Sequence, residues 1–191
     1  MNIRQNLPRA LGVFGVTIGA CLVAMFLALN IFVLEQQVLV TALGCFMIAA
    51  YLYLLSHFGA RDGAKALRHD NIVRTALARG DDRAASEGFR YRRIDGLIAP
   101  LLAALPWLLL CLADALAALL TSGTHPLDAF LRILLSPYII LLISIPLGSP
   151  LLYAALFLVS VPFYFLGYLT APVLLRRERA AIAQTRRSAS K

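Results

Sequence analysis

Long apolar runs alternate with short polar segments along this chain. Three runs, 10–34, 38–58 and 133–175, contain no Asp, Glu, Lys or Arg, and a fourth run, 97–120, contains only Asp114. A helix rises 1.5 Å per residue, so about 20 apolar residues cross the roughly 30 Å hydrocarbon core of a bilayer. All four runs reach that length. The pattern therefore predicts an all-α, polytopic membrane protein built as a bundle of four transmembrane helices.

The polar segments between the runs set the expected boundaries within one membrane domain, residues 1–191. We expect transmembrane helices at about 11–34, 38–58, 96–121 and 151–174, a polar loop at 59–95 and a tail at 176–191. Inside the loop, 64–79 lacks Gly and Pro and can form a helix, which could lie on the membrane surface. The reading we favour for 59–95 is a solvated, positively charged loop.

The last apolar run is too long for one crossing. Its 43 residues would form a helix of roughly 65 Å, about twice the hydrocarbon core. Pro146 and Pro150 interrupt it, and proline breaks helices because it lacks a backbone donor. We expect 127–147 to be an interfacial or re-entrant segment before a single final crossing. Two crossings in 133–175, five in all, are the alternative.

The cationic residues predict the orientation. Of 18 Lys and Arg residues, 17 lie in 1–9, 59–95 or 176–191, and the other is Arg132. Because cytoplasmic segments carry an excess of Lys and Arg, both termini and the long loop are expected in the cytoplasm. The chain then reads as a multi-pass protein of a bacterial plasma (inner) membrane.

Composition narrows the function classes. The chain is 60% apolar and 15% charged, which excludes an ordinary soluble domain. Its net charge of +8 sits beside the apolar runs, where anionic lipid headgroups attract it, so we expect a lipid bilayer and no nucleic acid as its partner.

Catalytic and metal-binding signatures are missing from the sequence. The three Cys residues all lie inside apolar runs, and the three His residues are widely spaced, so no metal or other cofactor is expected. The sequence lacks GxSxG, HExxH and phosphate-binding glycine loops. These observations disfavour an enzyme without excluding a site assembled from dispersed residues. Such a site would bring His57, Asp62 and Asp95 together in one cleft.

Small residues mark one face of the first helix. They recur at spacings of about four, which lets another helix backbone approach closely. The helix-packing residues on this face are Gly12, Gly15, Gly19, Ala20 and Ala24. The face either packs against other helices of the same chain, which we favour, or forms a homodimer contact.

Three polar residues near the expected outer ends of the helices are candidate binding residues: Asn30, Glu35 and Asp114. Asp114 lies roughly 25 Å along its helix, near the outer edge of the hydrocarbon core. With His125, Asp128 and Arg132 these residues would form a polar outer vestibule. An intramembrane carboxylate marks a substrate or ion site, but at this depth it can instead reach headgroup water, which we favour.

One stretch resembles a known group of proteins. Gly59-x-Arg61-Asp62, then Asn71 and Asp95-Gly96-Leu97-Ile98-x-x-Leu101 before Pro106, resemble a loop in small uncharacterised membrane proteins of Gram-positive bacteria. The resemblance implies a membrane fold and no particular activity.

These patterns together favour a non-enzymatic role, as a subunit or accessory component of a larger membrane complex or as a small transporter. The alternative is a membrane-embedded enzyme that acts on a lipid or small metabolite at the cytoplasmic face.

Overall fold

The computed structural model describes residues 3–31, 37–80, 91–121, 126–138 and 150–189. Its elements are α1 (Ile3–Ile31), α2 (Gln37–Ala78), α4 (Asp95–Thr121), α5 (Pro126–Leu134), the 3-10 turn η1 (Ser136–Tyr138) and α7 (Pro150–Ala189). No strand occurs in these ranges, and α1, α2, α4 and α7 are long and apolar enough to span a membrane. The prediction of an all-α polytopic bundle is confirmed, and the chain is a multi-pass membrane protein.

Helix α2 runs 42 residues, roughly 63 Å, well beyond the predicted 38–58. The first half of the predicted loop 59–95 is helical, and it continues the transmembrane helix instead of forming a separate surface helix. The charged residues from Arg61 onward indicate where α2 leaves the apolar region. They do not end the helix, because residues 64–79 contain no Gly or Pro and can continue it. Gly80 ends it with φ 83°, the left-handed conformation typical of a helix C-terminus.

Helix α7 also exceeds its predicted extent. It begins at Pro150, a residue well suited to the first helical turn because its missing N–H needs no partner there. It then continues through Ala189, so the predicted tail is part of the same 40-residue helix up to that point. Pro137 lies in η1, whereas Pro146 lies outside the described residues.

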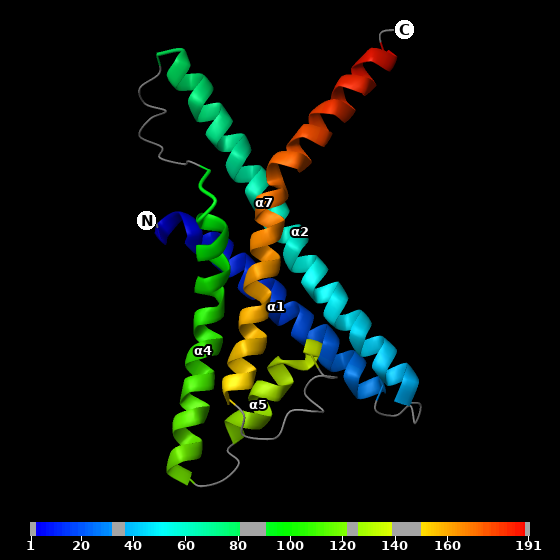
Figure 1. The fold of residues 1–191 in the computed structure, drawn as a ribbon, viewed down its shortest axis with the longest axis vertical. Helices are drawn as coiled ribbons and strands as arrows, with labels where there is room; N and C mark the ends of the chain where they lie inside the picture. Colours follow the sequence, from blue (N-terminus) through cyan, green and yellow to red (C-terminus); the bar gives the residue numbers. More distant parts are fainter. Residues whose placement is uncertain (1–2, 32–36, 81–90, 122–125, 139–149, 190–191) are drawn as a thin grey trace.

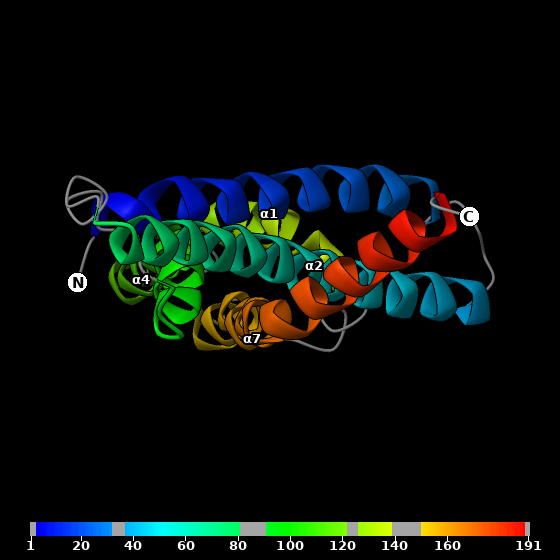
Figure 2. The ribbon, with the colours of Figure 1, turned by 90° about the horizontal axis from the view of Figure 1, so that it is seen from above.

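The two long helices cross. Figure 1 shows α2 and α7 meeting near the middle of the molecule and diverging above this point, with their charged halves spread apart. We call the segments 61–79 and Arg176–Ala189 the two arms; the first is helical as far as Ala78. α1 and α4 begin at the same end, which we call the basic end. Seen from above, α1 follows one edge of the molecule and α7 lies toward the other (Figure 2).

The described residues between α4 and α7, 126–138, pack against the other helices. α5 contacts α1, α4 and α7, and η1 contacts α1 and α2. Leu131, Leu135 and Tyr138 from this segment are buried in the main core cluster. Residues 139–147 lie outside the described part of the chain, so the interfacial or re-entrant segment at 127–147 and the number of crossings in 133–175 stay predictions.

Candidate functional site

Glycines bring the backbones of α2 and α7 into contact where they cross. A methyl group at Gly59 would overlap the carbonyl of Tyr164, and one at Gly167 would overlap the carbonyl of Ser56. Gly63 approaches Tyr168 and Ala171 in the same way. Sequence reasoning missed this contact because it placed 59–95 in a loop. The signal was present as Gly59-x-x-x-Gly63, a small-residue spacing typical of close helix pairs.

Tyr168 lies at the centre of the basic end. Its ring is fully buried, with Gly96 of α4 packed directly against it. Tyr91 stacks on the ring at a centroid distance of 5.2 Å and an interplanar angle of 6°, and the Arg9 guanidinium lies 5.9 Å from the ring centroid. The Tyr168 hydroxyl has no hydrogen-bond partner among the described residues. The ring therefore joins α1, α4 and α7 largely through packing.

Polar side chains around this ring connect the helices. Asn6 Nδ2 donates to Asp95 Oδ1 at 3.2 Å, which links α1 to the first turn of α4. Arg9 donates to Asn6 Oδ1 at 3.3 Å. The Tyr164 hydroxyl donates to Asp62 Oδ2 at 2.8 Å, linking α7 to α2. We call these residues the basic-end cluster: Asn6, Arg9, Asp62, Tyr91, Asp95, Tyr164 and Tyr168.

Tyr91 closes the cluster from the segment that precedes α4. Its hydroxyl donates to the Tyr168 carbonyl oxygen at 3.4 Å. Burial raises the pKa of the Tyr91 hydroxyl above its usual range, and the nearby Arg93 opposes part of that effect. The phenol therefore remains a neutral donor at physiological pH.

The structure brings together only part of the catalytic set considered from sequence. Asp62 and Asp95 both belong to the basic-end cluster, each bonded to a different helix. His57 is exposed and stacks on Tyr53 with ring centroids 6.2 Å apart, so it does not join them. The described residues contain no group of three His, Cys, Asp or Glu side chains placed to hold a metal ion.

A second polar group lies near the opposite end of the bundle. The Tyr153 hydroxyl donates to Asp128 Oδ1 at 2.7 Å and accepts from Arg132 Nε at 2.9 Å. Arg132 also pairs with Asp128 at 3.5 Å, and the Asp128 carboxylate is almost fully buried. This triad fixes α5 to α7. Two of the residues predicted for an open vestibule are thus engaged in a closed, buried contact.

The three candidate binding residues are not brought together. Asp114 on α4 is only 1% exposed, so protein surrounds it, and the expected contact with headgroup water is wrong for this residue. Helical position gives depth in a bilayer but does not say which neighbours cover a side chain. The Asn30 side chain, Glu35 and His125 lie outside the described residues.

Side-chain to backbone hydrogen bonds hold η1 against α1. Cys21 Sγ donates to the Leu134 carbonyl at 2.6 Å, and Ser136 Oγ donates to the Cys21 carbonyl at 2.8 Å. The rings of Tyr51 and Tyr138 meet edge to face, 5.8 Å apart. The first bond gives a partner to a carbonyl at the end of α5, where carbonyls lack partners within the helix, and the second attaches η1 to α1.

The small-residue face of α1 does not pack as we favoured. A methyl group added at Gly12, Gly15 or Gly19 would meet nothing within 4 Å. Ala24 is buried and Ala20 packs against the core, so these two residues do serve intrachain packing. The three glycines lie on a neighbouring face of α1, which no other helix covers at these positions.

Part of that open face is a groove between α1 and α2. The groove has a volume of about 390 Å³, and Pro137 of η1 also lines it. Its lining is apolar apart from the Tyr51 hydroxyl, which bonds to Thr17 at 3.2 Å. The lining residues used below are Val16, Gly19, Val23, Ala50, Leu54 and Phe58.

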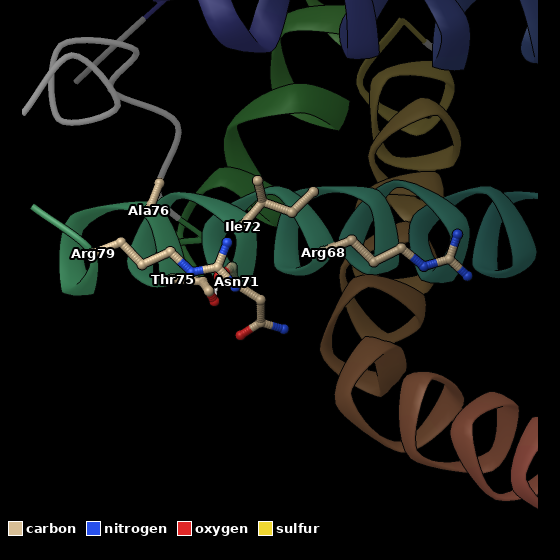
Figure 3. A pocket seen from close by; sticks show the side chains of 6 residues that line it. All are labelled: Arg68, Asn71, Ile72, Thr75, Ala76 and Arg79. Atoms are coloured by element: carbon tan, nitrogen blue, oxygen red, sulfur yellow. Dashed lines mark hydrogen bonds between the residues drawn. The ribbon is translucent and has the colours of Figure 1, made fainter. Parts of the chain in front are cut away.

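A shallower depression of about 490 Å³ follows the α2 arm (Figure 3). Its lining comes from α2 and the residue directly after it: Arg68, Asn71, Ile72, Thr75, Ala76 and Arg79. Arg68 extends along the helix toward α7 and forms an exposed ion pair with Glu178 of the other arm. The depression is thus one face of an exposed helix, with a cation at each end.

Comparison with protein-family models, curated proteins and solved structures gave no match. The resemblance over 59–106 and the functional predictions stay predictions.

Proposed function

We propose that this protein is a non-enzymatic accessory subunit of a membrane assembly, which docks on an acidic surface of its partner protein through the two arms. The observation that carries the proposal is the continuity of α2 and α7 beyond their crossing. Arg61–Ala78 and Arg176–Ala189 extend roughly 27 Å and 21 Å as helix. Part of the α2 arm, including Ala64 and Ala66, packs into the core. The exposed faces of both arms offer a preformed surface to another protein.

The charge on the arms supports an acidic partner. On the α2 arm, Arg61, Lys65 and Arg79 are exposed, and on the α7 arm Arg176 and Arg177 are exposed. Complementary potentials speed association and select partners, even where each ion pair adds little affinity. An acidic face that spans both arms would meet cations on each of them.

Orientation follows from the same residues. The excess of Lys and Arg at the basic end favours a cytoplasmic location for both arms and both termini, in the plasma (inner) membrane. The partner would then be a cytoplasmic protein or the cytoplasmic domain of a membrane protein.

The basic-end cluster favours this role over the membrane enzyme. A catalytic carboxylate needs to face its substrate, whereas Asp62 and Asp95 hydrogen-bond to Tyr164 and Asn6 of neighbouring helices. These bonds stabilise the positions at which α1, α2, α4 and α7 meet. The cluster thus supports the geometry of the arms.

The test is affinity purification of the full chain in mild detergent, comparing two charge-reversed variants. Arg79→Glu with Arg177→Glu changes one exposed residue on each arm. Arg92→Glu with Arg93→Glu makes the same charge change at exposed residues off the arms. We expect the arm variant to lose most of its co-purifying partner protein and the control to retain it. Equal retention by both variants, or recovery of the wild-type chain alone, would contradict the proposal.

A further inference from the structure

The groove between α1 and α2 has an apolar lining and lies beside cationic residues, and a single amphipathic ligand would match both features. It opens between membrane-spanning segments, so it faces lipid hydrocarbon and not water. Along α2 it extends from Phe46 to Phe58, roughly 18 Å, and ends three residues before Arg61. That length is close to one bilayer leaflet, and hence to one extended acyl chain.

Cationic residues continue the face of α2 that lines the groove. Residues spaced by three, four, seven and eleven share one side of an α-helix. Arg61 follows Leu54 by seven residues and Lys65 follows it by eleven, so both stand in line with the groove at the basic end. Both are exposed, and both precede the interarm pair at Arg68.

The open face of α1 also continues toward the basic end. Gly12 and Gly15 continue the line of Val16 and Gly19 toward the basic end, with nothing within 4 Å of an added methyl group. At these positions no neighbouring helix covers α1, so its face stays open on the side of the basic end.

We propose that this groove binds an anionic glycerophospholipid from the leaflet at the basic end, with one acyl chain along the α2 lining from Phe46 to Phe58 and the phosphate beside Arg61 and Lys65. The acyl chain fills an apolar cavity within the volume range of small-molecule sites. The headgroup phosphate is attracted to each of the two basic residues near the membrane surface.

A second copy of the chain is a poorer occupant. Copies in one membrane share an orientation, and a two-fold contact brings the same surface of each to the axis. Packing through this groove would therefore place Arg61 and Lys65 of one copy near the same residues of the other. Like charges repel there, whereas a phosphate neutralises them.

The test uses delipidated, detergent-solubilised protein titrated with an equal mixture of phosphatidylglycerol and phosphatidylcholine, and native mass spectrometry to count retained lipids. Gly19→Leu fills the groove, and its Cβ meets no atom within 4 Å. Ala50→Leu fills it from the α2 side, in case the first variant fails to fold. Ala113→Leu adds the same bulk at an exposed position of α4 and serves as the control.

Arg61→Gln with Lys65→Gln removes the cations, and Arg176→Gln with Arg177→Gln is its charge-matched control.

We expect the wild type to retain one phosphatidylglycerol per chain, with about a tenfold preference over phosphatidylcholine. Each groove-filling variant should reduce retention of both lipids about tenfold, while Ala113→Leu should not. Arg61→Gln with Lys65→Gln should remove the preference but still retain phosphatidylcholine. Unchanged retention in both groove-filling variants, or equal loss of preference in the two charge variants, would overturn the proposal. A wild-type dimer that Gly19→Leu converts to monomer with no loss of lipid would assign the groove to a second copy.

Discussion

The carbonyl oxygen of Ser56 on α2 lies where the Cβ of any larger residue at Gly167 on α7 would stand. The two backbones therefore touch at this point with no side chain between them. Since lipid is as apolar as leucine, such close packing is a main source of helix association in a membrane. The contact lies at the crossing from which both arms diverge (Figure 1), so it also sets where the arms begin.

Gly167→Ala should destabilise the bundle by about 2 kcal/mol, because the added methyl group forces two helix backbones apart. Gly15→Ala is the matched control, since a methyl group there meets nothing within 4 Å. Alanine also favours helix over glycine, so the control should be neutral or stabilising by up to about 1 kcal/mol. Unfolding in mixed detergent micelles, followed by circular dichroism, measures both. Equal stability of the two variants would mean that the crossing is looser than described.

Two tyrosines of the basic-end cluster should respond differently to loss of the hydroxyl. Tyr164→Phe removes the donor to Asp62 and should cost about 1–2 kcal/mol. Tyr168→Phe removes a buried hydroxyl without a hydrogen-bond partner among the described residues, so it should be neutral or stabilising. Both changes leave ring packing intact, which makes each the control for the other. The same unfolding assay compares them, and a larger loss for Tyr168→Phe would show that its hydroxyl is bonded.

The Asp128 triad predicts a non-additive pair of substitutions. Arg132→Met leaves a nearly fully buried carboxylate without its cation and should cost about 3 kcal/mol. Asp128→Leu together with Arg132→Met removes both charges and should cost less than the single change, because no buried charge is left unpaired. A double-mutant cycle on unfolding free energies measures this difference. Strict additivity would mean that Asp128 and Arg132 do not interact.

The sequence predicted the existence of the spanning helices because a bilayer admits few alternatives to an uncharged helix of about 20 residues. It predicted their ends poorly. Arg61 and Arg176 mark where charge begins, but helix formation depends on backbone hydrogen bonds, which charge does not interrupt. α2 and α7 therefore run on as arms where the pattern indicated a loop and a tail.

The site was harder to predict for a different reason. Gly15-x-x-x-Gly19 and Gly59-x-x-x-Gly63 have the same spacing, yet only the second meets another helix. The spacing shows that one face of a helix carries small residues. Which helix packs against that face depends on how all the helices are arranged. The basic-end cluster is likewise assembled from residues of α1, α2, α4 and α7, and no local sequence motif predicts it.

The number of crossings and the orientation can be tested together by thiol labelling in intact cells. In the structure the two arms lie at the same end of the bundle, and α2 begins at the other end (Figure 1). In a background without the native cysteines, Arg79→Cys and Ala180→Cys should react with a membrane-impermeant maleimide only after permeabilisation, since both positions are exposed on the arms. Val38→Cys, at a position 83% exposed near the start of α2, should react without permeabilisation. Reaction of Ala180→Cys from outside, with Arg79→Cys still protected, is the result that five crossings would give. Reversal of all three results would be compatible with the same fold in the opposite orientation. The arms would then lie outside the cell, and a cytoplasmic partner would be ruled out.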